Sequence, residues 1–451
     1  MRKVFVFLFF PFLIFAIWDT CIISFNRWQF TFYNYGMGGA GYWPSPLRNL
    51  YIFGTGIMIG CINGGDTLVT IGYHPFSGRS EMVSTLCRYW RGGYNDPRDR
   101  IYRYPDDWPP PRSRFPMAPI KPLSDVDIWC CFSDSDPAYH RPNDTRPIGI
   151  DIALTLYGFT DTFAKDFFFL KYELFNYNNY PINDMYFGIV LDGDIGYHGD
   201  DLTKFILNRL FRIGNDTIRI KNLGLIYDYD NHESPSRNWE RGIPGAVGIK
   251  LLSAPLESIT AFKILPSSGE SLNDVKWYLA LAGYEWHIPG RRIPYDTIDT
   301  VAGDKAFLMS LGPFNLLPCS TLTFYYAVIG SRYGESLMIG PKLDSIALID
   351  ISKRVEEYFE RLIGIKEEFI SDNKLSPIEI FYNPIKSFLV LHIKPTTKKE
   401  IIRIFDISGK LVKDFILPSQ KEVVEIPLKG INPGIYFLGF KGVVKKFIFL
   451  K

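Results

Sequence analysis

Short segments in which apolar and polar residues alternate are the feature that most constrains the fold of this chain. Residues 148–156 (IGIDIALTL) carry an aliphatic side chain at every second position, and residues 168–174 and 185–191 repeat this period around an Asn-rich turn. A period of two is typical of half-buried β-strands. Clusters of Gly, Pro, Asn and Asp separate many such segments between residues 22 and 340, so the sequence predicts an antiparallel β-sandwich body.

Two connections between these segments have the character of hairpins. The turn at residues 176–184 predicts a strand, a connection and a returning strand, and residues 213–218 predict a tighter hairpin of the same kind. The 36 Phe and 27 Tyr residues of the chain favour strands as well. We therefore expect a mainly β protein.

One segment near the end of the body departs from the period of two. Residues 345–363 place Ile346, Val355, Phe359 and Leu362 close to one helical face, which predicts a single amphipathic helix. The polar residues that follow predict an interdomain linker at 366–376. The predicted organisation is thus a body at 22–365, this linker, and a C-terminal domain at 377–451.

The N-terminus has the plan of a secretory signal peptide, which we assign to residues 1–20. Arg2 and Lys3 precede an apolar run over residues 4–18, which Asp19 closes. A transmembrane helix needs about twenty apolar residues, so this run is too short, and no later stretch is long enough to give the mature chain a spanning helix. Acylation of Cys21 is the alternative, but the residues before it do not suit a lipoprotein processing site.

The six cysteines and the prolines exclude some structures and suggest others. No two cysteines have C-x-x-C spacing, so zinc-ribbon and thioredoxin-type motifs are absent, and disulfide partners stay unassigned. Eight prolines fall within residues 94–122, which predicts a long loop or an extended cover over the sheet. Residues 36–41 formally match a dinucleotide fingerprint, but a Pro-rich stretch follows where a helix is required, so we expect a flexible segment there.

Residues 377–451 contain seven short strand patterns separated by turns, which predict a small immunoglobulin-like β-sandwich. Its motifs run in a set order, and their residues are Tyr382, Asn383, Pro384, Asp406, Gly409, Lys410, Gly434, Tyr436, Lys445 and Lys446. In order and spacing at the C-terminus, they resemble the type A C-terminal sorting domain of the type IX secretion system. A plain adhesive immunoglobulin-like module is the alternative.

This resemblance implies how the protein is delivered. It implies export through the periplasm, recognition of the folded tail by the type IX secretion machinery, and release or attachment at the outer cell surface. The ten motif residues would carry the sorting signal. The segment at 171–194 resembles the bodies of uncharacterised secreted proteins that carry such a tail, which assigns no activity.

Two acidic loops are the main candidates for chemistry in the body. Asp192, Asp194, Asp200 and Asp201 lie on a Gly-rich loop directly after a predicted strand, where carboxylates can offer the oxygen ligands that calcium requires. A solvated acidic loop and a catalytic carboxylate pair are the alternatives. Residues 228–233 (DYDNHE) form a second, weaker loop of this type. Calcium is the one cofactor that the sequence suggests.

Hydrolase signatures are missing from the sequence. There is no G-x-S-x-G, no H-E-x-x-H and no Walker loop, although a triad can assemble from distant positions. Trp90, Trp108, Trp239, Trp277 and Trp286 lie beside turn-forming or charged residues, so exposed tryptophans that stack on extracellular polysaccharide are a further hypothesis.

The distribution of charge argues against nucleic acid as a partner. The whole chain has a formal net charge of +2. Residues 377–451 carry 13 Lys and Arg against 6 Asp and Glu, whereas the rest carries 37 against 42. The body is therefore acidic and would repel a phosphate backbone.

These observations favour a secreted or cell-surface protein whose body is a non-enzymatic binding or structural β-sandwich. The alternative is an extracellular hydrolase that acts on polysaccharide or peptide. An enzyme should gather two or more of Asp192, Asp194, Asp200, Asp228 and Asp230 in a deep cleft with raised pKa values. A binding module should show a flat aromatic strip or a carboxylate cage at calcium distances.

Overall fold

The structure is a computed structural model of the chain. It describes residues 18–90, 96–140, 146–213, 216–265, 272–296, 299–331, 345–368, 378–383, 388–393, 400–406, 411–417, 423–428, 431, 434–440 and 443–449. The chain divides into two compact units, 1–363 and 364–451.

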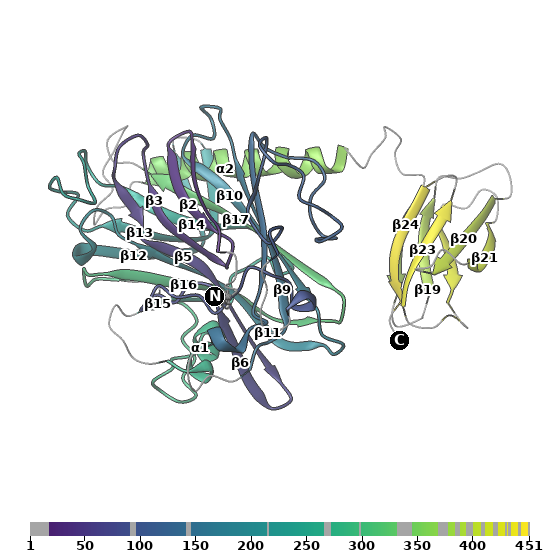
Figure 1. Ribbon diagram of the computed structural model, residues 1–451. Helices are drawn as coiled ribbons and strands as arrows, with labels where there is room; N and C mark the ends of the chain where they lie inside the picture. Colours follow the sequence, from purple (N-terminus) through teal and green to yellow (C-terminus); the bar gives the residue numbers. More distant parts are fainter. Residues whose placement is uncertain are drawn as a thin grey trace, which may run out of the picture. The chain divides into compact units, whose positions relative to one another are not determined.

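The first unit contains two antiparallel sheets (Figure 1). The nine-stranded sheet has the order β1 (Thr20–Phe25), β2 (Trp28–Tyr33), β3 (Met37–Tyr42), β5 (Gly54–Asn63), β11 (Ile182–Gly193), β16 (Lys305–Leu316) and β15 (Ala261–Leu265), with β4 (Leu50–Ile52) beside β3 and β6 (Asp66–Ile71) beside β5. The eight-stranded sheet has the order β12 (Asp201–Ile213), β13 (Asp216–Asp228), β14 (Ala246–Ser253), β17 (Thr321–Ser331), β10 (Phe167–Asn176), β9 (Ile150–Gly158), β8 (Val126–Ser133) and β7 (Tyr102–Arg103).

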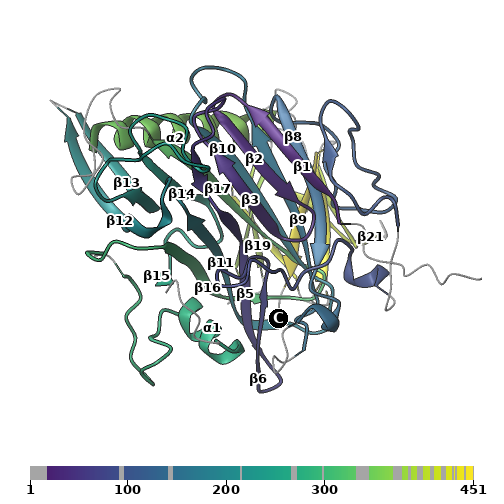
Figure 2. The same ribbon diagram turned by 60° about the vertical axis from the view of Figure 1, so that its left-hand side comes forward.

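Aromatic side chains join the inner faces of the two sheets. The rings of Phe187 on β11 and Phe324 on β17 stack with their centroids 4.3 Å apart, and those of Phe205 on β12 and Phe262 on β15 lie 4.6 Å apart. Figure 2 shows β1, β2, β3 and β5 in front of β10, β17 and β9. The predicted antiparallel sandwich is therefore confirmed, with one continuous apolar core between its sheets.

The outer face of the eight-stranded sheet is also covered, which corrects the prediction of half-buried strands. Every residue of β9 is buried. The Pro-rich segment packs Phe115 against Trp129 of β8, with ring centroids 5.1 Å apart, and the same apolar cluster includes Ala153 of β9. The cover predicted from the prolines is present and buries part of the second face, around Ala153, whereas Tyr157 on the same face lies in the apolar cluster of helix α2 (Ser345–Glu368).

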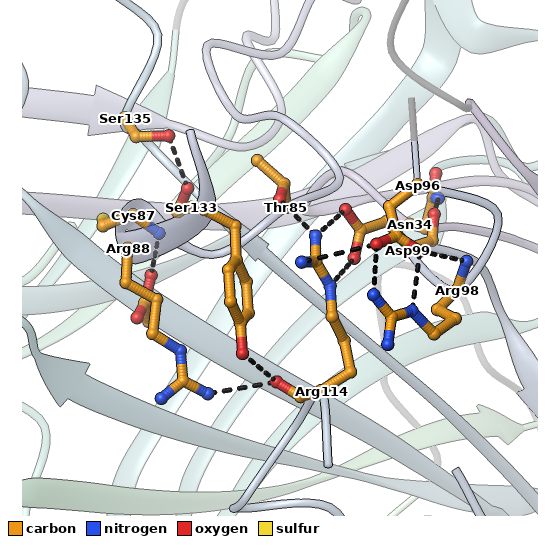
Figure 3. Close-up of polar contacts among 12 residues, drawn as sticks. Asn34, Thr85, Cys87, Arg88, Asp96, Arg98, Asp99, Arg114, Ser133 and Ser135 are labelled. Atoms are coloured by element: carbon orange, nitrogen blue, oxygen red, sulfur yellow. Dashed lines mark hydrogen bonds and ion pairs between the residues drawn. The ribbon is translucent and has the colours of Figure 1, made fainter. Parts of the chain in front are cut away.

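A buried ion pair holds this Pro-rich cover in place (Figure 3). Arg114 is 7% exposed, and its guanidinium donates to both carboxylate oxygens of Asp99, at 2.9 and 2.6 Å. Asn34 Nδ2 donates to the main-chain oxygen of Asp99 at 3.1 Å, which ties the cover to the end of β2. The planar guanidinium suits such a two-oxygen contact.

Two α-helices cover further parts of the outer faces. Helix α2 (Ser345–Glu368) packs Val355 and Phe359 on the eight-stranded sheet, where the ring of Phe359 contacts Tyr325 of β17. The predicted helix at 345–363 is present and continues into the first residues of the predicted linker. Helix α1 (Asp274–Leu281) buries Trp277 in an apolar cluster with residues of β6 and β16.

The two predicted turns differ in outcome. Strands β12 and β13 pair antiparallel with Ile213 opposite Asp216, as expected for a tight hairpin. The strand that returns after the Asn-rich turn is present as β11, but it lies in the sheet opposite β10, so these strands form no hairpin. The buried amide of Asn176, at the end of β10, donates to main-chain oxygens of Tyr180 and Leu316. These hydrogen bonds stabilise the connection where the chain passes from one sheet to the other.

Residues 37–42, which we expected to belong to a flexible segment, form strand β3 instead. A Cβ atom at Gly38 would lie 2.4 Å from the ring of Phe30. The glycines therefore allow close packing on β2.

All six cysteines are free thiols, and Cys130 and Cys131 are both buried. Residues 1–17 of the predicted signal peptide lie outside the described residues. Asp19 and Thr20, the last residues assigned to that peptide, are among the described residues: Asp19 Oδ2 accepts from the main-chain N–H of Ile101 at 2.9 Å, and Thr20 begins β1. Among the described residues, no helix has the length and apolar character needed to cross a membrane.

The second unit contains two small antiparallel sheets. One has the order β18 (Ile378–Asn383), β19 (Phe388–Ile393) and β22 (Val423–Pro427), and the other has β21 (Leu411–Leu417), β20 (Glu400–Asp406), β23 (Gly434–Phe440) and β24 (Val443–Phe449). Leu389 of β19, Ile404 of β20 and Leu438 of β23 share one apolar core. The seven predicted strands are thus present as a small β-sandwich.

Candidate functional site

Strand pairing brings the two predicted acidic loops to one end of the body. In the nine-stranded sheet Gly193 at the end of β11 pairs with Lys305 at the start of β16, and in the eight-stranded sheet Asp201 pairs with Asp228. An isolated bridge joins Asp201 to Gly303, just before β16. The loops after β11 and β13 and the segment before β16 therefore meet.

The carboxyl groups gather in two clusters that differ from the predicted set of four aspartates. The inner cluster contains Asp192, Asp194 and Asp304, and the outer cluster contains Asp200, Asp228 and Glu233. Within each cluster, one carboxylate oxygen of every residue lies within 4.8 Å of the other two. The structure thus divides the predicted calcium ligands between two places.

Asp201, the fourth predicted ligand, belongs to neither cluster. It is fully buried, and its Oδ2 accepts from the main-chain N–H of Ile195 at 3.1 Å. Burial raises the pKa of Asp201 well above its usual range. The Asp201 side chain therefore stabilises the loop after β11 through this hydrogen bond to Ile195.

The inner cluster is buried at the end of β11. Asp192 is 6% exposed, and the hydroxyl of Tyr73 donates to its Oδ2 at 2.5 Å. Burial raises the pKa of Asp192 to about 8, against the opposing effect of the Tyr73 hydrogen bond. Burial and the Asp304 carboxylate raise the pKa of Asp194 to about 6, whereas His198 acts to lower it. Asp192 and Asp194 therefore hold protons far more strongly than ordinary carboxyl groups.

The outer cluster is built on contacts between the two loops. Glu233 Oε1 accepts from the main-chain N–H of Tyr197 at 2.6 Å, and burial raises the pKa of Glu233 to about 7. Asp228 accepts from the N–H of Asn231, and burial raises its pKa to about 7 as well. Gly196 has a φ of +75°, and a Cβ there would lie 2.2 Å from Cδ of Glu233, so a side chain at this position would displace Glu233.

Two neighbouring cavities open onto these clusters. The larger, of about 900 Å³, is lined by Asp200, Asp230 and Glu233 together with the aromatic residues Tyr42, Phe53 and Tyr197. The smaller, of about 300 Å³, is lined by Asp192, Asp194 and Asp304. Phe53 and His198 line both cavities, so the two lie side by side.

The cleft carries basic groups as well as acidic ones. Arg48, Arg237, His198 and His232 line the larger cavity. A loop that includes Arg237 is anchored by Trp239, which is fully buried and whose Nε1 donates to the main-chain oxygen of Gly242 at 3.0 Å. The walls of the larger cavity therefore offer both hydrogen-bond donors and acceptors, and the loop with Arg237 is held by Trp239.

The predicted stacking tryptophans lie elsewhere. Trp239 and Trp277 are fully buried, so the hypothesis that they are exposed is wrong for these two. Trp108 and Trp286 are partly buried against apolar clusters, and Trp90 is partly buried. Tryptophans beside turns therefore contribute to apolar clusters in this protein. The exposed aromatic residues that line the larger cavity are Phe53 and Tyr197.

The sequence did not indicate Asp304, which lies in no acidic run. Its place just before a strand was the available signal, but its approach to Asp192 depends on the pairing of β11 with β16. Glu233 was part of the weaker second loop, and its meeting with Asp200 of the first loop was not expected.

Comparison with known proteins identifies the C-terminal unit. Residues 379–449 match the family described as "Secretion system C-terminal sorting domain". These residues are a sorting domain of the type IX secretion system. The sorting domain indicates recognition by the type IX machinery and export to the cell surface or the medium.

The predicted sorting residues are only partly within the described strands. Tyr382 and Asn383 lie at the end of β18, Asp406 ends β20, Gly434 and Tyr436 lie on β23, and Lys445 and Lys446 lie on β24. Pro384, Gly409 and Lys410 lie outside the described residues. Tyr436 is buried in the core of the sorting domain.

For the body, the comparisons are weaker. No curated protein sequence matches the chain. Similar solved structures include a polysaccharide lyase, at 8% identity and a TM-score of 0.29, covering 96% of this chain and 46% of the lyase. A proposed aldose 1-epimerase from Escherichia coli K12 has 8% identity and a TM-score of 0.31, covering 69% of this chain and 98% of that protein. These scores are too low to carry an argument about the body.

Proposed function

We propose that this is an exported extracellular protein whose body binds a carbohydrate chain in the larger cavity. The observation that carries this proposal is the lining of that cavity, which includes the acidic residues Asp200, Asp230 and Glu233 together with the aromatic residues Phe53 and Tyr197. Carboxylates accept hydrogen bonds from sugar hydroxyls, and aromatic faces pack against the apolar faces of sugar rings. A volume of about 900 Å³ suits such a ligand.

Delivery of this body follows from the sorting domain. We propose that residues 1–20 direct the chain to the periplasm and that residues 377–451 then carry the sorting signal. The body at 22–365 would act outside the cell, beyond the linker at 366–376. Its acidic character agrees with a neutral or basic carbohydrate as ligand.

A binding screen tests the proposal. The purified exported protein is applied to an array of extracellular polysaccharides, and affinity for any ligand found is measured for two variants. Tyr197→Ala should weaken binding by about tenfold, because it removes an exposed ring from the cavity. Tyr177→Ala, which removes a similarly exposed tyrosine from the β10–β11 turn, should have no effect. Absence of binding to every polysaccharide, or equal loss in both variants, would contradict the proposal.

A hydrolase that acts on polysaccharide is the second candidate, because carboxyl groups in both clusters have raised pKa values. A carboxyl group that holds its proton near neutral pH can act as a general acid, and Asp194 at about 6 and Glu233 at about 7 lie in the useful range. Reducing ends released in the wells of the same screen would support hydrolysis. Glu233→Gln should then abolish product release while leaving the fold intact.

A further inference from the structure

The outer cluster has the spacing of a calcium site. One oxygen from each of Asp200, Asp228 and Glu233 lies within 4.8 Å of the other two. Ligand oxygens on opposite sides of a calcium ion are about 4.8 Å apart, because each calcium–oxygen distance is roughly 2.4 Å. A single ion can therefore contact all three carboxylates.

Buried oxygens without partners provide an independent indication of a cation. Asp228 is 1% exposed, its Oδ1 accepts from the N–H of Asn231, and its Oδ2 is buried with no hydrogen-bond partner among the described residues. Asp200 Oδ1 and Asn231 Oδ1 are likewise buried and unpartnered there. Such oxygens cost free energy unless something compensates them, and buried charges are normally paired or bound to metal.

The outer cluster has no lysine or arginine partner among the described residues, although His198 and His232 lie nearby. Within the part of the chain that the structure describes, none of Asp200, Asp228 and Glu233 forms an ion pair with a lysine or arginine. The inner cluster differs, because none of Asp192, Asp194 and Asp304 has a buried oxygen without a partner among the described residues. The unpartnered buried oxygens therefore lie in the outer cluster.

We propose that Asp200, Asp228 and Glu233 bind a calcium ion, with Asn231 Oδ1 as a further oxygen donor. All four donors are oxygen atoms, the ligand type that calcium prefers, whereas zinc sites typically use nitrogen and sulfur ligands. The ion joins the loop before β12 to the loop after β13, and so holds together one wall of the larger cavity. This site replaces the predicted set of Asp192, Asp194, Asp200 and Asp201.

Titration with the metal alone tests the site. The purified exported protein is stripped with chelator and titrated with calcium chloride by isothermal calorimetry. We expect saturable binding and a rise in melting temperature with calcium concentration, since a ligand that binds the folded state stabilises it. Glu233→Gln and Asp228→Asn should each weaken the affinity by at least about tenfold.

The control is Glu257→Gln, which changes an exposed glutamate on another loop and should keep wild-type affinity. If Asp228→Asn fails to fold, Glu233→Gln, at a partly exposed position, carries the test. No heat and no thermal shift with calcium would overturn the proposal, and so would unchanged affinity in Glu233→Gln or equally tight binding of magnesium. Because no carbohydrate is present, failure of the proposed carbohydrate binding cannot produce any of these results.

Discussion

Asp192 is a carboxyl group whose protonation is coupled to folding. Burial at the end of β11 raises its pKa to about 8, whereas an aspartate in an unfolded chain titrates near about 3.9. The folded state therefore binds this proton more tightly than the unfolded state. The resulting stabilisation is complete below about pH 4 and is lost as the pH rises through about 8.

Asp192→Asn should remove this pH dependence, because the amide does not titrate. We expect the free energy of unfolding to fall less between about pH 5 and about pH 8 in the variant than in the wild type, by a few kcal/mol. Urea unfolding at several pH values, in the presence of chelator, measures the difference. Asp184→Asn, at an exposed position of the same strand, should follow the wild-type curve. Parallel curves for Asp192→Asn and the wild type would contradict the assignment.

At the scale of elements, helix α2 covers an apolar face that the sheet could not leave exposed. Phe169 of β10 and Tyr325 of β17 point away from the central core, and both rings contact Phe359, with centroids 5.8 and 5.2 Å apart. Val355 is fully buried in the same cluster. The helix is thus part of the body's packing and not a spacer.

Phe359→Ala should destabilise the body by about 3–5 kcal/mol, because it leaves a cavity between helix and sheet. Denaturant unfolding followed by tryptophan fluorescence measures the change. Lys353→Ala lies on the exposed face of the same helix and should have little effect, since alanine also favours helix. Similar stability of Phe359→Ala and the wild type would show that α2 does not pack on the sheet in solution.

At the scale of the whole molecule, the sorting domain and the body are separate compact units. Residues 377–451 form a basic sandwich with its own core, and the body has a separate core between its sheets. Separate cores agree with a sorting domain that the secretion machinery recognises and a body that acts after export. We therefore expect the body to fold when the sorting domain is deleted.

Deleting residues 377–451 should leave a folded body in the periplasm. Cell fractionation with an antibody to the body locates the protein, and its melting temperature tests folding. A chain of equal length with Tyr436→Asp in the core of the sorting domain should be retained in the same way, because a buried charge disrupts that core. Normal appearance of the deletion variant at the cell surface would contradict the role of the tail.

The sequence predicted local features well. Most of the alternating segment at 148–156 lies in β9, which spans Ile150–Gly158, and the predicted helix at 345–363 is α2. Its errors concern contacts. The period of two implied one solvent-exposed face for β9, yet the Pro-rich cover and helix α2 bury that face as well. The strand after Asn176 lies in the other sheet and not beside β10. Hydrophobic period reports the shape of a segment, but it does not report what packs against its second face.

The candidate site illustrates the same division. The sequence by itself determined the strand-rich character, the acidic loops and the sorting domain, because period, turn chemistry and motif order are properties of contiguous residues. Only the tertiary structure decided that Asp304 joins Asp192, that Asp200 meets Glu233, and that Asp201 lies beneath the loop. These side-chain contacts depend on which strands pair at one end of the sandwich. That pairing depends on the burial of apolar residues throughout the body.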